Sequence, residues 1–154
     1  MSAKLTILVG IPGCGKSTYA RTHYGLDDWV VSSDRIRAEL GDVNDQSKNE
    51  EVFRLFHAEI GALLIARKSV IADSTALDGF ARKTLRKIGK ECGAEVHLVY
   101  FSNIAAAARR NQERERVVPA KAMDRMLAKY EVFKLDLPRE SVEYDTITEI
   151  RSFG

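Results

Sequence analysis

The chain contains 154 residues, of which 45% are hydrophobic and 30% are charged, and its formal net charge is +2. A chain of this length can bury roughly 68–70% of its unfolded surface, so it can fold as one domain without a disulfide or a structural metal. The composition is typical of a soluble globular protein. The net charge is too small to indicate nucleic acid, or any other partner, on composition alone.

The two cysteines, Cys14 and Cys92, are far apart in a chain that is long enough to form its own core. This pattern does not indicate a disulfide framework, and we expect free thiols in a reducing compartment. The amino-terminal apolar run is too short for a signal peptide, and no segment approaches the twenty apolar residues of a membrane span. The sequence therefore predicts a cytoplasmic protein that does not enter the membrane, and it is silent on protein partners.

Short β-branched segments alternate along the chain with longer segments of helical period. A polar stretch, residues 41–50, is expected to be a loop, and Phe53 and Phe56 are expected to pack in the core from one helical face. The expected strands and helices, in chain order, are strand 5–9, a helix to about residue 24, strand 29–32, helix 34–40, a helix around 53–64, strand 69–72, helix 80–92, strand 95–101, helices 104–115 and 120–133, and strand 144–150.

No linker, repeat or low-complexity tract divides the sequence, so we predict a single domain over residues 1–154. Strands that alternate with helices predict an α/β fold, a parallel sheet flanked by helices as a three-layer sandwich. In such sheets, ligands bind beyond the carboxyl ends of the strands. Three polar segments follow expected strands at this edge, residues 10–18, 33–37 and 73–75, and we expect them to converge on one site.

Residues 10–17, Gly-Ile-Pro-Gly-Cys-Gly-Lys-Ser, match the phosphate-binding motif G-x-x-x-x-G-K-[ST] without a mismatch. The glycines let successive backbone N–H groups face phosphate oxygens, and the following helix presents its positive end. The lysine would reach the β- and γ-phosphates, and the serine hydroxyl would bind Mg²⁺. The alternative is a chance match in a glycine turn. The motif predicts binding of ATP or another nucleoside triphosphate with Mg²⁺ by Gly13, Cys14, Gly15, Lys16, Ser17 and Thr18.

Asp34 follows the second expected strand, and Arg37 lies one helical turn after it. A carboxylate beside the phosphate loop can orient an acceptor hydroxyl and take its proton, and an arginine can bind a substrate phosphate with two hydrogen bonds. The alternative is that Asp34 caps the short helix and that Arg37 is a surface charge. The pattern favours phosphoryl transfer to a hydroxyl group.

Asp73 ends the third expected strand, and its role is open between several possibilities. It could bind Mg²⁺ through water, contact the acceptor, hold Arg37, or cap a helix.

Arg110 and Arg114 are four residues apart and therefore share one face of the helix expected at 104–115. Arginines of a helical lid, here placed at about residues 103–130, can neutralise charge on a transferred phosphoryl group. The alternative is a solvated helix face, and for Arg109 and Arg116 both interpretations stay open. We predict that Arg110 and Arg114 bind the nucleotide and that Lys16, Asp34 and Arg114 are catalytic.

The segments that carry a resemblance cover most of the chain: residues 10–18, Asp34 with Arg37, Val70-Ile-Ala-Asp73-Ser74, Arg110-Asn111 with Arg114, and Val118-Pro119 followed by a helix with Met126. Together they resemble the 5′-hydroxyl polynucleotide kinase family, the kinase half of phage and bacterial end-healing enzymes.

This resemblance implies a P-loop kinase fold with a helical lid, in which the γ-phosphate of ATP passes to the 5′ end of DNA or RNA. It further implies that Asp34 is the general base and that Arg37 holds the 3′-phosphate of the terminal nucleotide. Asp73 would support the acceptor site, and Arg114 would contact the donor phosphates. Two other functions stay open: a kinase for a small hydroxyl compound such as a sugar, nucleoside or antibiotic, and a nucleotide-binding module without catalysis.

Overall fold

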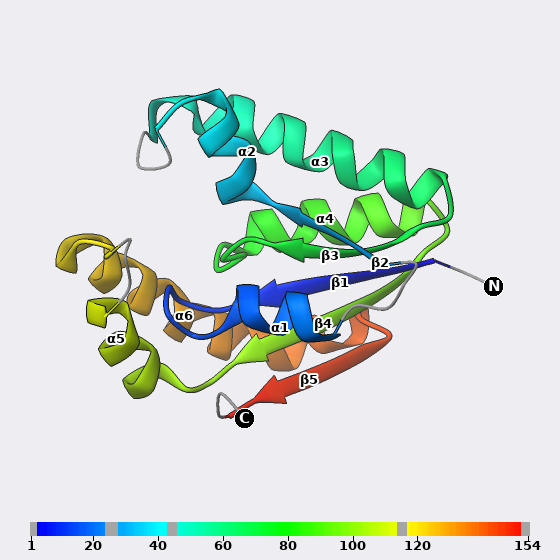
Figure 1. Cartoon of the computed structure of the whole chain (residues 1–154). Coiled ribbons are helices and arrows are strands. Elements are labelled where there is room, and N and C mark those ends of the chain that lie inside the picture. The colour runs from blue at the N-terminus through cyan, green and yellow to red at the C-terminus, as the bar shows by residue number, and fades with distance from the viewer. Residues whose placement is uncertain (1–2, 24–27, 43–45, 114–116, 152–154) are drawn as a thin grey trace.

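A five-stranded sheet forms the centre of the computed structural model, which describes residues 3–23, 28–42, 46–113 and 117–151 (Figure 1). All pairings are parallel, and the strand order is β2-β3-β1-β4-β5. The predicted α/β fold is confirmed, with the phosphate-loop strand at the centre of the sheet. The strands are β1 (Lys4–Val9), β2 (Asp28–Ser32), β3 (Ser69–Asp73), β4 (Glu95–Phe101) and β5 (Thr146–Ile150).

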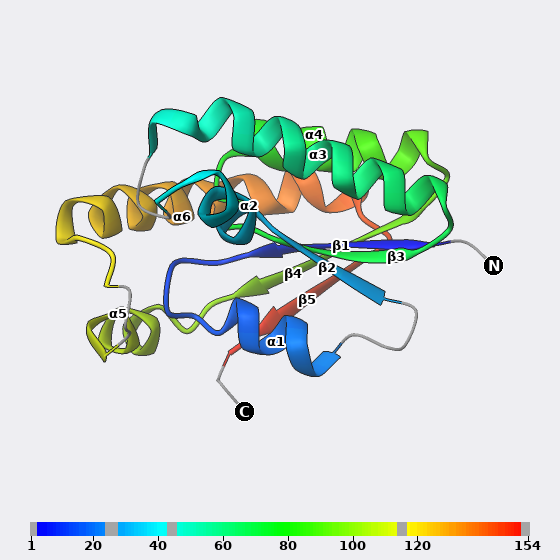
Figure 2. The same cartoon turned by 45° about the horizontal axis from the view of Figure 1, so that its top comes forward.

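Helices cover both faces of the sheet, as the tilted view makes clear (Figure 2). Three of them, α3, α4 and α6, lie over one face, and α1 lies against the other. In Figure 1, α2, α5 and the beginning of α6 lie beyond the carboxyl ends of the strands. The helices are α1 (Lys16–His23), α2 (Ser33–Leu40), α3 (Asn49–Ile65), α4 (Gly79–Glu91), α5 (Ile104–Glu113) and α6 (Ala120–Glu140), with short 3₁₀ turns at Gln46–Lys48 and Ser141–Glu143.

Part of the core lies between the sheet and the three helices α3, α4 and α6. Leu5 and Ile7 of β1 are fully buried, and Phe56 and Ile60 of α3 pack into the same cluster. Burial of such a side chain contributes about 1.5–3 kcal/mol. Four of the six residues of the central strand β1 are apolar, which agrees with helices on both faces of a parallel sheet.

Two helices extend beyond the segments expected from the sequence. Helix α3 begins at Asn49, inside the stretch expected to be a loop, and α6 continues to Glu140 with Pro138 in its last turn. A proline there removes one hydrogen bond near an end where few bonds remain to be lost. Within the described residues, no helix is both long enough and apolar enough to cross a membrane.

The sheet register brings the predicted polar segments together. Ser32, the last residue of β2, pairs with Asp73, the last residue of β3. The backbone N–H of Gly10, directly after β1, donates to the carbonyl oxygen of Thr75 at 3.2 Å. The segments that follow β1, β2 and β3 therefore begin side by side at one edge of the sheet.

Candidate active site

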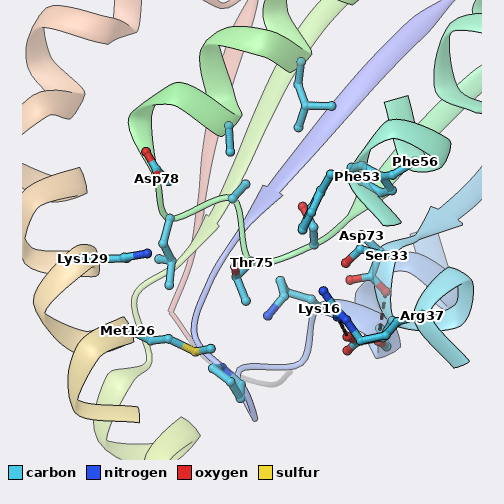
Figure 3. A pocket seen from close by; sticks show the side chains of 18 of the residues that line it. Lys16, Ser33, Arg37, Phe53, Phe56, Asp73, Thr75, Asp78, Met126 and Lys129 are labelled. Atoms are coloured by element: carbon cyan, nitrogen blue, oxygen red, sulfur yellow. Dashed lines mark hydrogen bonds and ion pairs between the residues drawn. The ribbon is translucent and has the colours of Figure 1, made fainter. Parts of the chain in front are cut away.

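A cavity of about 630 Å³ lies beyond the carboxyl ends of the strands. Its lining combines the phosphate loop, the first turn of α2, residues of α3, the segment after β3, and residues of α5 and α6. Figure 3 shows Lys16, Ser33, Arg37 and Asp73 gathered on one side, while Met126 and Lys129 reach in from α6 on the other. All three predicted segments contribute to this cavity.

The phosphate loop has a conformation that requires its glycines. Gly13 and Gly15 have φ values of +88° and +99°, in the left-handed region that favours glycine. A Cβ atom on Gly13 would lie 2.4 Å from the carbonyl oxygen of Ala107 in α5. Gly13 is thus fixed by its backbone angle and by its contact with α5.

Lys16 begins α1, and its amine is held inside the loop. Its Nζ donates to the carbonyl oxygens of Gly10 and Ile11 at 2.9 and 3.3 Å. The buried Cys14 Sγ lies 3.7 Å from the same amine. The ammonium group therefore lies inside the loop, where it donates to backbone carbonyl oxygens of the loop itself.

Ser17 and Asp73 form a direct link between the phosphate loop and β3. The Ser17 hydroxyl donates to Asp73 Oδ2 at 3.0 Å. Burial raises the pKa of the Asp73 carboxyl; the Lys16 ammonium and the Ser17 hydrogen bond lower it, and the Asp34 carboxylate raises it again, with a net rise. Asp73 does not cap a helix, because the cap of α4 is Asp78, whose side chain accepts from the Phe80 N–H.

The Ser17–Asp73 pair fits a magnesium ion. Hydroxyl and carboxylate oxygens are the ligands that Mg²⁺ prefers, and this ion usually keeps further ligands from phosphates and water. Among the residues that the structure describes, no group of three or more His, Cys, Asp or Glu side chains is arranged for a metal. A Mg²⁺ ion at this position would therefore take few ligands from the described part of the protein.

Asp34 lies in the first turn of α2 and lines the cavity with a half-exposed side chain. The alternative that it caps this helix is wrong, because Ser32 is the cap and accepts a hydrogen bond from the Arg35 N–H at 3.2 Å. Asp34 Oδ1 instead accepts from Arg37 Nη1 at 3.1 Å. Its carboxylate is thus presented at the cavity by the helix.

Arg37 is 6% exposed and so is not a surface charge, although it lines the cavity. Its Nη1 donates to Asp34, and its Nη2 donates to Asn49 Oδ1 at the beginning of α3. Its Nε is buried and has no hydrogen-bond partner among the described residues. A buried donor without a partner costs about 1–3 kcal/mol, so this atom needs an explanation.

The predicted lid is described only in part. Arg110 lies in the last turn of α5 and lines the cavity, whereas Arg114 and Arg116 lie outside the described residues. The buried Asn103 donates to the carbonyl oxygen of Cys14 at 3.2 Å. Together with the contact at Gly13, this bond places α5 directly against the phosphate loop.

Several cavity residues were not among the sequence predictions. Asn49 lay in a stretch expected to be a loop, and no pattern marked it. Phe53 was expected to be core; it is half-buried, packs on the core and also lines the cavity. No sequence motif includes His57 or Lys129. The helical pattern of the surrounding residues predicts a helix but does not indicate which of its faces borders a cavity.

Residues 5–133 match the AAA domain family. The chain belongs to this family. It is a nucleotide-binding domain with a P-loop kinase-like fold.

Solved structures with the same fold come from proteins of different function. A chain of the Pnkp1/Rnl/Hen1 RNA repair complex matches with a TM-score of 0.76 and 23% identity, over 88% of this chain and 46% of that one. The APS kinase CysC of Mycobacterium tuberculosis matches with a TM-score of 0.53 and 19% identity, over 64% and 75% of the two chains. The tunicamycin resistance protein of Deinococcus radiodurans matches with a TM-score of 0.63 and 16% identity, over 99% and 87%.

At these identities the matches show the fold alone. A second match to a Pnkp1/Rnl/Hen1 complex, at 29% identity and a TM-score of 0.59, covers 64% of this chain and 35% of that one. The chain thus spans less than half of the length of the RNA repair chains that it matches.

Proposed function

We propose that this domain is an ATP-dependent polynucleotide kinase, which transfers the γ-phosphate to the 5′-hydroxyl of DNA or RNA. The observation that carries the proposal is that one cavity is lined both by Lys16 of the phosphate loop and by the Asp34–Arg37 pair. A phosphate donor and an anionic hydroxyl acceptor can therefore meet in the same space.

On the donor side, the phosphate loop would surround the ATP phosphates with backbone N–H groups. Lys16 would exchange its bonds to the carbonyl oxygens of Gly10 and Ile11 for phosphate oxygens. Ser17 and Asp73 would hold the accompanying Mg²⁺, whose charge offsets that of the phosphates. Arg110, and with it Arg114, would approach the phosphates from the lid.

On the acceptor side, Asp34 would accept a hydrogen bond from the 5′-hydroxyl and take its proton. The hydroxyl oxygen then forms a bond to the γ-phosphorus as the bond from that phosphorus to the bridging oxygen breaks, and ADP leaves with that oxygen. Asp34 is suited to this step because it is half exposed in the cavity and is oriented by Arg37.

Arg37 would bind the phosphate on the 3′ side of the terminal nucleotide. It is anchored by Asp34 and Asn49, and its buried Nε lacks a partner among the described residues. A phosphate can accept from guanidinium nitrogens, which are planar and fixed in direction. The anchoring also limits the entropy lost when the acceptor binds.

The test is transfer of labelled γ-phosphate from ATP and Mg²⁺ to a 5′-hydroxyl oligonucleotide, with Asp34→Ala and Lys16→Ala as variants. We expect labelling by the wild type and its loss in both variants, with the fold retained. Labelling that survives Asp34→Ala would exclude Asp34 as the base, and unaltered turnover by Lys16→Ala would exclude the phosphate-loop role.

A second candidate function is phosphorylation of a small hydroxyl compound. Its support is that the same fold occurs in an APS kinase and in a tunicamycin resistance protein. ATP binding without oligonucleotide labelling would favour this function, and a screen of hydroxyl compounds would follow. A nucleotide-binding module without catalysis would instead keep its behaviour when Asp34 is replaced.

A further inference from the structure

We propose that the cavity contains a subsite for a planar aromatic ring, formed on α3 by Phe53 with Phe56 and His57 behind it, and that this subsite binds the nucleobase of the acceptor's terminal nucleotide. The proposal rests on the polynucleotide kinase function and adds to it the group that recognises the base. None of the sequence motifs includes these three residues.

The first observation is an aromatic cluster at the cavity surface. Phe53, Phe56 and His57 all line the cavity, and Figure 3 shows Phe53 among the side chains that border it. Phe53 meets Phe56 edge to face, with ring centroids 5.7 Å apart, and meets His57 at 6.2 Å. Phe56 is fully buried, so it supports the half-buried Phe53 from below. The Phe53 ring is therefore held in place at the cavity wall.

The second observation is the distance from the cluster to the predicted anion site. Asn49, which accepts the hydrogen bond from Arg37, is four residues before Phe53 on the same helix. Residues at this spacing lie one above the other, about 6 Å apart. A ligand whose phosphate reached Arg37 would thus bring a group one helical turn away against Phe53. In a nucleotide, sugar carbons alone separate the base from the phosphate, which suits this spacing.

The third observation is the chemistry of the surrounding wall. Leu77, Leu85 and Met126 complete an apolar lining, and Phe80 at the rim is 78% exposed. Burial lowers the pKa of His57, which favours the neutral imidazole beside the phenyl rings. A cavity in which aromatic rings lie one helical turn from the Arg37 cation suits an acceptor with a phosphate and a planar base.

The experiment compares two acceptors that differ only in the base. Both are short oligonucleotides with a 5′-hydroxyl and a 3′-phosphate on the terminal sugar; one carries thymine there, and the other carries an abasic tetrahydrofuran residue. Stacking of a base on an aromatic side chain accounts for about 5- to 150-fold in affinity by alanine substitution. We expect Phe53→Ala to lower kcat/KM for the thymine acceptor by that factor, mostly through KM, and to leave the abasic acceptor within about twofold. Phe53→Tyr should restore the preference for the base.

A binding measurement makes the result independent of catalysis. Trp29, the only tryptophan, lies in β2 and does not line the cavity. The double variant Phe53→Trp with Trp29→Phe places the one tryptophan at the proposed subsite, and the wild type carries the matched control fluorophore at position 29. We expect the thymine acceptor to quench the fluorescence of the double variant but not of the wild type, and the abasic acceptor to quench neither.

The outcomes separate the subsite from the proposed function. Equal losses with both acceptors in Phe53→Ala would overturn the subsite, since they indicate a packing role only, and labelling by the wild type would still support the kinase. Base-dependent quenching without any labelling would support the subsite and count against the polynucleotide kinase. Absence of quenching in the double variant, with either acceptor, would overturn the subsite.

Discussion

Among the residues that the structure describes, two arginines are buried, Arg37 and Arg82, and they differ in how many of their donors have a partner. Arg82 is 0% exposed, and each of its nitrogens has a partner: Nε and Nη2 donate to Glu140 at 2.7 and 3.0 Å, and Nη1 donates to the carbonyl oxygens of Ala76 and Leu77. Arg37 is nearly as buried, yet its Nε has no partner among the described residues. Full pairing is typical of a structural arginine, whereas the incomplete pairing of Arg37 beside the cavity agrees with the proposal that it binds a ligand.

The surroundings of Arg82 support its structural role. Its guanidinium lies 4.7 Å from the centroid of the Phe133 ring, and Glu140 also accepts from Arg86 and from the Tyr144 hydroxyl. The cluster joins the end of α6 to the segment after β3, which lines the cavity. Arg37 instead joins α2 to α3 at the cavity wall, with the half-exposed Asp34 as one of its two partners.

Replacement of Arg82 should have the largest effect on the stability of the fold. Arg82→Met leaves Glu140 without two of its hydrogen bonds and leaves two backbone carbonyls unpaired, so we expect a loss of about 3–5 kcal/mol in the free energy of unfolding. Urea unfolding measures this value. The variant Arg82→Met with Glu140→Gln should recover part of the loss, because the carboxylate that has lost the Arg82 guanidinium is then replaced by a neutral amide. A loss below about 1 kcal/mol in the single variant would contradict the structural role.

Replacement of Arg37 should instead affect activity much more than stability. Its bonds to Asn49 and Asp34 are few, and Asp34 can be solvated after the change, so Arg37→Ala should change the free energy of unfolding by less than about 1 kcal/mol. A charged hydrogen bond to phosphate contributes about 1.5–3 kcal/mol, which corresponds to a loss of about 10- to 150-fold in kcat/KM.

The loss at Arg37 should be confined to acceptors with a 3′-phosphate. The matched control is Arg35→Ala, which removes an exposed arginine of the same helix that pairs with Glu59. Equal losses on acceptors with and without the 3′-phosphate would contradict the assignment of Arg37 to this phosphate.

The two arginines also differ in whether the sequence predicted them: Arg37 was predicted as a site residue, and Arg82 was not. The fold followed from alternating strands and helices, and Gly10, Lys16 and Asp34 could be located because each follows a strand whose carboxyl end lies at one edge of the sheet. This reasoning is geometric and needs no side-chain detail. It also selected Arg37, one turn after Asp34.

The remaining residues of the cavity depend on contacts that no local pattern encodes. Arg82 lies on a helix with many charged residues and looks like any of them, since its partner Glu140 is 58 residues away. Phe53 is apolar on a helical face in the same way as Phe56, and only the position of α3 against the cavity separates them. The helix expected to end at residue 133 continues to Glu140, with Pro138 in its last turn.

Replacement of Asp73 at the cavity should change the free energy of unfolding by less than replacement of Arg82. Its pKa is raised by burial, so the ionised form is disfavoured in the fold: stability is highest below the unfolded pKa and is lost as the pH rises through the folded value. At neutral pH the fold carries this cost in full. Asp73→Asn should therefore raise the free energy of unfolding, by up to about 1 kcal/mol.

The same change should lower phosphoryl transfer, because the neutral amide is a poorer Mg²⁺ ligand than the carboxylate. Thermal unfolding and oligonucleotide labelling of one preparation measure both effects. A variant that is less stable than the wild type at pH 7 would show that the bond from Ser17 outweighs the cost of burial.

At Glu140 the stability of the fold should depend on pH in the opposite direction. Burial raises the pKa of its carboxyl, but the hydrogen bonds from Arg82 and Tyr144 and the charges of Arg82 and Arg86 lower it by more, so the net pKa lies below its ordinary value. Its contribution is present above the unfolded pKa and is lost as the pH falls through the folded value. The stability difference between the wild type and Glu140→Gln should therefore shrink as the pH falls from 6 towards 3.

The exposed Glu143, which pairs with Lys90, provides the control. Salt should weaken the effect of Glu143→Gln on stability while leaving that of Glu140→Gln largely intact. A difference for Glu140 that stays constant with pH would mean that the Arg82 cluster acts through shape and packing, and the contrast with Arg37 would then rest on burial alone.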